Sequence, residues 1–140
     1  MIAVDTNVLL RYLLADDARQ FSKAKKLVSE NRPVLITDVV LVESIWTLSG
    51  KRYGLDKAAL SKVIRGLFGD AAFMFEDNQV VWSSLRDYEG SKKVRGKDLD
   101  FSDALIVNKA RYSAELKGVP LAAFYSFDKA VEQLTGAQIG

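Results

Sequence analysis

Met1-Ile2-Ala3-Val4-Asp5-Thr6-Asn7-Val8-Leu9-Leu10 opens the chain with four apolar residues, a carboxylate and then apolar residues at helical spacing. Four apolar residues are too few for a signal peptide and are typical of a short buried strand. Asp5 is therefore expected at the carboxyl end of a strand, where open α/β sheets build their sites. The structural alternative is that Asp5 only caps the following helix, a role that Asp fills well.

Length and composition narrow the class of protein. The chain has 140 residues, a length typical of one domain, and we predict a single domain over residues 1–140. Cys is absent, which excludes thiol nucleophiles and thiolate zinc sites and is typical of a reducing compartment. His is absent too, which excludes Ser-His-Asp triads and imidazole metal ligands. No apolar run approaches the roughly 20 residues that span a bilayer, so we expect a soluble, cytoplasmic protein with no membrane partner.

The apolar spacing predicts strands that alternate with helices. Short apolar runs indicate strands at residues 1–4, 34–36, 71–75 and 120–125, and helical periodicity follows each of them. Repeated strand–helix units form a parallel sheet flanked by helices and joined by right-handed crossovers. We therefore predict an α/β protein with a three-layer α/β/α arrangement around a central parallel sheet of four or five strands.

Four acidic residues follow predicted strands or lie in helices that do so. They are Asp5, Glu43, Asp103 and Asp128. In a parallel sheet these positions share one edge, so independent capping roles would require a coincidence. Two carboxylates about 4 Å apart repel by roughly 4 kcal/mol at an effective dielectric constant near 20, so such a group needs a cation. All-oxygen coordination favours Mg²⁺ or Mn²⁺.

Glu43 and Asp103 also have structural interpretations. Glu43 is the only ionisable residue in an apolar helix, and it has a cationic partner, belongs to a site, or lies at a rim with its carboxylate in water. Asp100 or Ser102 can cap the helix that contains Asp103. Asp103 shares a helical face with Ile106 and other apolar residues, which predicts an inward carboxylate.

The same residues resemble the ordered acidic motifs of PIN-domain ribonucleases. The matching segments are Val4-Asp5-Thr6-Asn7-Val8-Leu9, the lone Glu43, Asp100-Phe101-Ser102-Asp103-Ala104-Leu105-Ile106 and Ser126-Phe127-Asp128. The compact length is most similar to VapC-type toxins of bacterial type II toxin–antitoxin pairs. The resemblance implies a PIN-like fold in which Asp5, Glu43 and Asp103 hold Mg²⁺ or Mn²⁺. It also implies a fourth acidic role for Asp128, with support from Asp100, Ser126, Thr6 and Asn7.

The implied activity is metal-dependent cleavage of RNA. Water activated by a metal ion attacks the phosphodiester in line and leaves a 5′-phosphate, with no need for His. A basic loop precedes the Asp103 helix, and its side chains are candidates for phosphate contacts, as is Arg11; the loop residues are Lys92, Lys93, Arg95 and Lys97. A solvated loop with no ligand is the alternative.

Three other protein classes also have acidic residues after strands or a PIN-like sequence. An aspartyl phosphatase usually has a second Asp two residues after the first, where this chain has Asn7. A phospho-receiver domain carries its acceptor Asp on a later strand. A non-catalytic PIN-like module that binds RNA or protein is the remaining alternative, and a metal titration separates it from the nuclease.

Two helical segments, 39–48 and 59–68, carry more apolar residues than one core-facing stripe needs. The surplus residues Leu41, Ile45, Trp46, Leu55 and Phe68 predict a groove for an amphipathic partner helix, with internal packing as the alternative. The resemblance implies a homodimer and a VapB-like antitoxin that occupies such a groove.

Overall fold

The fold is described from a computed structural model that covers residues 1–134 and 137–139. The chain divides into two compact units, Met1–Asn78 and Gln79–Gly140, and each is described by itself. Within the described residues no helix is both long enough and apolar enough to span a membrane.

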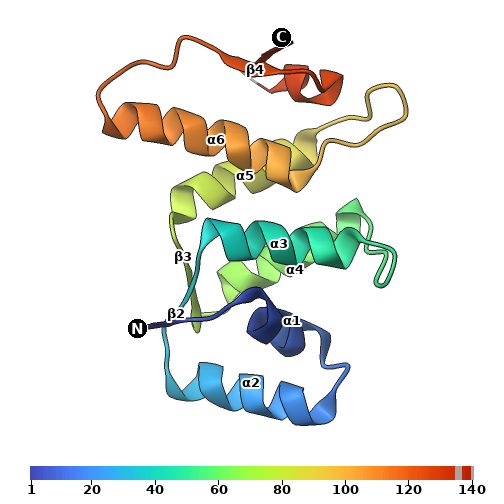
Figure 1. The fold of residues 1–140 in the computed structure, drawn as a ribbon, viewed down its shortest axis with the longest axis vertical. Helices are drawn as coiled ribbons and strands as arrows, with labels where there is room; N and C mark the ends of the chain where they lie inside the picture. Colours follow the sequence, from blue (N-terminus) through green and yellow to red (C-terminus); the bar gives the residue numbers. More distant parts are fainter. Residues whose placement is uncertain (135–136, 140) are drawn as a thin grey trace. The chain divides into compact units, whose positions relative to one another are not determined.

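The first unit contains a parallel sheet and four helices (Figure 1). Its elements are β1 (Ile2–Ala3), α1 (Thr6–Leu14), α2 (Ala18–Glu30), β2 (Val34–Ile36), α3 (Asp38–Ser49), α4 (Lys57–Gly69) and β3 (Phe73–Phe75). The strands lie in the order β1-β2-β3, with Ile2 opposite Val34 and Val34 opposite Phe73. Because all three strands are parallel, the residues that follow them lie at one edge of the sheet.

The core of the first unit comes from the sheet and from the inner faces of its helices. Val34, Ile36, Leu9, Leu41 and Ile64 have no exposed surface. Leu41 and Ile45 are therefore core residues, which corrects their predicted place in a partner groove. Phe68 is half-buried, with its ring centroid 4.6 Å from that of Phe75.

Trp46, in contrast, does not belong to the core, because 74% of its surface is exposed. Val39 on the same helix α3 is 66% exposed. These two residues are seven positions apart and so lie on one helical face.

The second unit consists of two helices, a short parallel pair of strands and a 3-10 turn. Its elements are α5 (Asn78–Gly90), α6 (Phe101–Leu116), β4 (Phe124–Ser126), η1 (Lys129–Gln133) and β5 (Ala137–Ile139). Buried Ser84 on α5 bonds across to the carbonyl of Ala104 on α6 at 3.4 Å, and the rings of Tyr88 and Phe101 meet edge to face. These contacts hold the two helices together.

The loop between α5 and α6 forms a tight hairpin. Val94 and Lys97 exchange backbone hydrogen bonds of 2.9 and 3.1 Å. The two residues between them, Arg95 and Gly96, have positive φ angles of 53° and 77°. Positive φ at both central positions is the requirement of a type I′ turn.

The α/β class and the parallel pairing agree with the prediction, and the distribution of strands differs from it. The described residues form five parallel strands, three in the sheet of the first unit and two in the second, where one sheet of four or five was expected. The strand predicted at 120–125 is confined to Phe124–Ser126. Pro120 has no N–H for a sheet ladder and Leu121 is 40% exposed, so this part of the run does not pair.

Candidate functional site

Asp5 follows β1 and caps α1. Its Oδ1 accepts a hydrogen bond of 3.0 Å from the backbone N–H of Val8, which confirms the capping interpretation. Within the described residues its Oδ2 has no hydrogen-bond partner, and the side chain is exposed. Capping therefore occupies one carboxylate oxygen and leaves the other available as a ligand.

Glu43 lies on α3 and is linked to the residue after Asp5. The Oγ1 hydroxyl of Thr6 donates a hydrogen bond of 3.1 Å to Oε2 of Glu43. Glu43 is exposed, so its carboxylate lies at a rim in contact with water, a position from which it can also serve as a ligand. The first unit thus brings together the first two predicted acidic positions through Thr6.

Asn7 and Arg11 project from α1 toward a cavity of about 350 Å³ between α1 and α2. Gln20 and Lys23 line the same cavity from α2. Arg11 also forms an ion pair of 2.8 Å with Asp16, so its guanidinium is already engaged by a carboxylate. Lys23 was not predicted as a site residue, because its position on the polar face of α2 matches that of an ordinary solvated lysine.

In the second unit, Asp100 and Asp103 lie at the beginning of α6. Asp100 occupies the N-cap position, yet its side chain makes no capping hydrogen bond. The backbone N–H of Asp103 instead donates to the carbonyl of Asp100 at 3.1 Å. Ordinary side-chain capping therefore does not account for the Asp100 carboxylate.

Asp103 is half-buried, and its surroundings disfavour its charge. Burial raises the pKa of Asp103, and the nearby negative charges of Asp100 and Asp128 raise it further. Lys97 acts in the opposite direction as the nearby cation. Burial and the two neighbouring carboxylates therefore both disfavour the ionised form of Asp103 in the fold.

The predicted apolar face of α6 needs one correction. Ile106 is 53% exposed, whereas Ala104, Leu105 and Val107 are buried. Asp103 consequently lies at the margin of the packed face rather than at its head.

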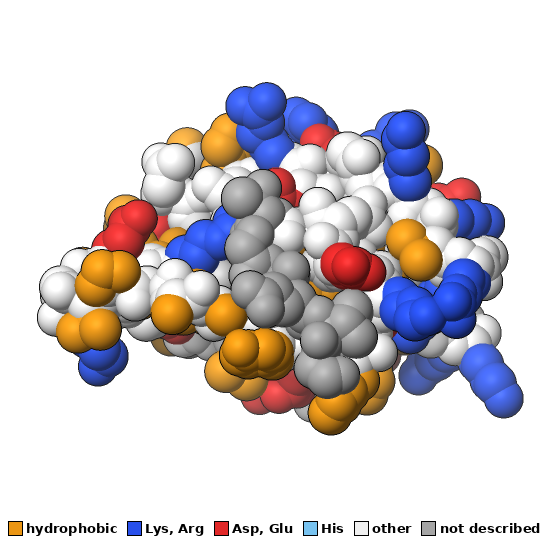
Figure 2. Space-filling view, turned by 90° about the horizontal axis from the view of Figure 1, so that it is seen from above, with side chains coloured by type: hydrophobic (Ala, Val, Ile, Leu, Met, Phe, Trp, Pro, Cys, Tyr) orange, Lys and Arg blue, Asp and Glu red, His pale blue; other side chains and the backbone are white. Residues whose placement is uncertain are grey.

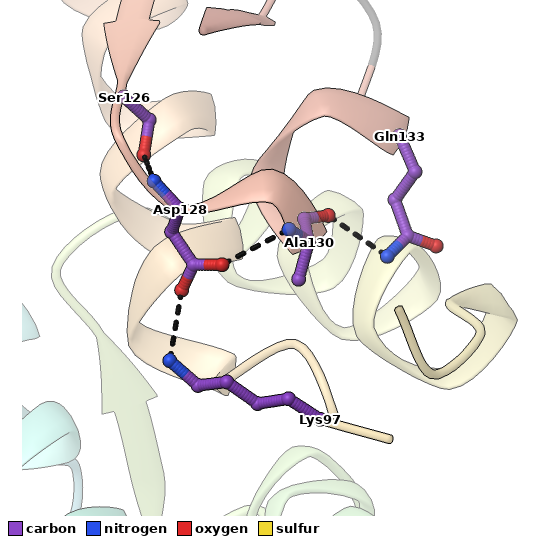
Figure 3. Close-up of polar contacts among 5 residues, drawn as sticks. All are labelled: Lys97, Ser126, Asp128, Ala130 and Gln133. Carbon is purple, nitrogen blue, oxygen red and sulfur yellow. Dashed lines mark hydrogen bonds and ion pairs between the residues drawn. The ribbon is translucent and has the colours of Figure 1, made fainter. Parts of the chain in front are cut away.

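Asp128 is held by three contacts, which Figure 3 shows. Its backbone N–H donates to Oγ of Ser126 at 3.0 Å, and its Oδ1 accepts from the N–H of Ala130 at 2.9 Å. Its Oδ2 accepts from Nζ of Lys97 at 3.2 Å. The hydrogen bond from Ala130 and then the one from Lys97 lower the pKa of Asp128. The hydroxyl of Ser126 therefore supports Asp128 by accepting a hydrogen bond from the Asp128 backbone N–H.

The basic loop has one residue that is not free to bind phosphate. Lys97 is paired with Asp128, whereas the side chains of Lys92, Lys93 and Arg95 are exposed. The backbone of Lys92 is bound at both its N–H and its carbonyl by the side-chain amide of Gln133, at 2.9 and 3.1 Å. The loop is thus tied to the η1 region at two points.

Two further acidic residues were missed by the sequence analysis. Asp38 follows β2 and Glu76 follows β3, and the backbone N–H of Asp38 donates to Oε1 of Glu76 at 3.3 Å. Glu76 stands directly after a short apolar run and Asp38 one residue after another, which is close to the signal that drew attention to Asp5. That signal, applied evenly, predicts acidic side chains at the ends of all three strands of the sheet.

The donor atoms suit a hard divalent cation. Every candidate ligand side chain offers carboxylate or hydroxyl oxygen, which is the donor set preferred by Mg²⁺ and Mn²⁺. A cation beside Asp103 would also offset the repulsion from Asp100 and Asp128 that raises the pKa of Asp103. Within each unit, the described residues include no cluster of three acidic side chains close enough to share one ion.

The comparisons with known proteins identify the family. The family model for the PIN domain matches residues 2–135. The chain belongs to the PIN domain family. This confirms the family that the sequence motifs predicted and the α/β class of the fold.

Among solved structures, this PIN domain is similar to VapC20 of Mycobacterium tuberculosis, a toxin that cleaves the sarcin–ricin loop. The two are 19% identical, the alignment covers 94% of this chain and 93% of VapC20, and the TM-score is 0.40. None of the curated proteins compared with the chain matched it.

Proposed function

We propose that this PIN domain is a metal-dependent endoribonuclease and the toxic component of a VapC-type type II toxin–antitoxin system. The observation that carries the proposal is the family match over residues 2–135 in a chain that retains acidic side chains at all four motif positions. The lack of His in the sequence supports a metal-dependent mechanism, because no imidazole is present to act as base or acid.

We assign Asp5, Glu43 and Asp103 as metal ligands and Asp128 as the fourth acidic residue, with Asp100 in support. When bound, Mg²⁺ or Mn²⁺ would acidify a water molecule and offset the charge of the scissile phosphate. The protein's own contribution is positional. Thr6 orients the Glu43 carboxylate, and Ser126 and Lys97 fix Asp128.

The substrate that we propose is RNA in single strands or loops. The exposed side chains of Lys92, Lys93 and Arg95 would contact backbone phosphates next to the acidic residues of the second unit. Lys97 contributes mainly through Asp128, and Arg11 is a weaker candidate because Asp16 already binds it.

RNA cleavage by the purified protein tests the proposal. Cleavage should require Mg²⁺ or Mn²⁺ and stop in EDTA, and Asp5→Asn should abolish it while the Asn side chain still caps α1. Asp17→Asn is the matched control, because Asp17 caps α2 in the same way at 3.0 to 3.1 Å and belongs to no acidic motif. Full activity in EDTA, or in Asp5→Asn, would refute the mechanism. RNA binding with no cleavage would identify a non-catalytic module.

We further propose a homodimer and a VapB-like antitoxin as the protein partners. The exposed pair Val39 and Trp46 on α3 supports a partner surface, since large apolar side chains on one helical face are costly to leave in water.

A further inference from the structure

Phe127 is the most exposed large apolar side chain among the described residues, with 88% of its surface in solvent. Tyr125, two residues earlier on β4, is 68% exposed. Neither ring is part of the packed core of the second unit, whose fully buried members include Val81, Leu85 and Leu99. The packing of the fold therefore does not explain these two aromatic rings.

The backbone on both sides of Phe127 is held in place. The hydrogen bond from the Asp128 N–H to Oγ of Ser126 closes a short turn around it. Asp128 then begins η1 through its bond from Ala130. As Figure 3 shows, the carboxylate of Asp128, at the end of this turn, also accepts a hydrogen bond from Lys97. An exposed ring on a turn fixed in this way loses little backbone freedom when it binds a ligand.

The surroundings of Phe127 are charged rather than apolar. Its immediate neighbours are Ser126 and Asp128, and the exposed Lys129 follows. The Lys97–Asp128 bond brings the basic hairpin with Arg95 to the same turn. Figure 2 shows Lys and Arg side chains at several separate places, with Asp and Glu side chains between them. A docking site for an apolar helix would need a continuous apolar surface, which two aromatic rings beside charged residues do not provide.

Single-stranded nucleic acid matches this combination of groups. Cationic side chains bind its phosphates, and exposed aromatic rings stack on its unpaired bases regardless of base identity. We propose that Phe127 is a stacking platform for one unpaired RNA base next to Asp128, with Tyr125 as a second ring. This inference rests on the proposed function. It assigns a contact to the RNA base, whereas the acidic and basic residues contact only the phosphates.

The test is RNA binding by the full-length Asp5→Asn protein in Mg²⁺, which keeps the probe intact. The probes are a fluorescent 12-nucleotide oligoadenylate and a ribose-phosphate 12-mer without bases, compared by anisotropy at one fixed salt concentration. The protein with Phe127 intact should prefer oligoadenylate by about five- to 150-fold, the range expected for one stacked base. Phe127→Ala should lose most of that preference and leave affinity for the baseless polymer unchanged.

Three further variants separate stacking from other roles. Phe127→Trp should keep the preference and Phe127→Leu should not, because leucine retains apolar bulk without an aromatic face. Leu116→Ala is the matched control, since Leu116 is 70% exposed and lies 13 residues, or about 20 Å, along α6 from Asp103. Circular dichroism and thermal unfolding of each variant verify that the fold is retained.

The outcomes distinguish this inference from the proposed function. An unchanged preference in Phe127→Ala, or full rescue by Phe127→Leu, would overturn the stacking role even if the wild-type protein cleaves RNA. Loss of preference in a protein that never cleaves RNA would support stacking and refute the nuclease. A protein that neither binds nor cleaves RNA would refute both.

Discussion

Thr6 and Glu43 lie 37 positions apart, and the Oγ1 hydroxyl of Thr6 donates a hydrogen bond of 3.1 Å to Oε2 of Glu43. The bond joins the first residue of α1 to the middle of α3. The residue next to one predicted ligand therefore orients the carboxylate of another. Groups that orient metal ligands in this way strongly affect metal affinity.

We expect Thr6→Val to lower cleavage about tenfold and to raise the Mg²⁺ concentration needed for half-maximal activity. The substitution keeps the side chain's shape and removes only its hydroxyl, so Thr6→Ser should restore activity. Thr47→Val is the control, because the Thr47 hydroxyl bonds only the backbone carbonyl of Glu43, at 2.8 Å. A Mg²⁺ titration of the three variants measures the effect, and equal loss in Thr6→Val and Thr47→Val would contradict it.

Asp103→Asn should leave the stability of the metal-free protein unchanged or raise it. The pKa of Asp103 is raised in the fold, so the folded state binds this proton more tightly than the unfolded state does. The ionised carboxylate therefore destabilises the fold at neutral pH, and this penalty disappears as the pH falls through the raised pKa. Thermal unfolding in EDTA at pH 7 and near pH 4 should show the advantage of Asn shrinking in acid. A lower melting temperature for Asp103→Asn at pH 7 would instead identify a structural cap.

Asp128 should behave in the opposite way. Its pKa is lowered in the fold, so its contribution is present above the unfolded pKa and is lost as the pH falls through the folded pKa. Asp128→Ala removes the cap of η1, which should cost about 0.5–1 kcal/mol at pH 7. The lost ion pair should add little, because the Lys97 side chain is exposed to water. Urea denaturation at pH 7 and pH 3 measures this, and a cost that persists in acid would disagree.

The exposed face of α3 predicts where a protein partner binds. Val39→Ala combined with Trp46→Ala should weaken binding to the proposed VapB-like antitoxin by tenfold or more, without loss of stability, because both side chains are solvated in the free protein. Phe68→Ala should chiefly reduce stability, because its ring packs against Phe75. Co-expression and calorimetry compare the variants, and unchanged affinity of the double variant would remove α3 from the interface.

The local elements were predictable from sequence, and the side-chain environments were predictable only in part. Residues 34–36 form β2 as predicted, because an apolar run between Pro33 and the helix-starting Thr37 has few other conformations. Helix α3 was also predicted, yet its nearly continuous apolar sequence has no clear period, so the buried Leu41 and Ile45 could not be distinguished from the exposed Trp46.

Contacts between distant residues were not predictable. Nothing in the sequence near Lys97 indicates that its ammonium binds Asp128, 31 residues away. The pattern of a basic loop is the same whether or not the fold places a carboxylate beside it. The same holds for Thr6 and Glu43. Such pairings depend on the tertiary fold, and they determine which charged groups remain available to a substrate.

The hairpin between α5 and α6 contains a conflict between folding and binding. Arg95 has a φ of 53°, a conformation that a side chain with a Cβ adopts at some energetic cost and that glycine adopts freely. Arg95→Gly should therefore stabilise the turn while weakening the affinity for RNA, since a positive charge is removed from its tip. An arginine at this position therefore costs the turn some stability and puts a positive charge at the tip of the hairpin.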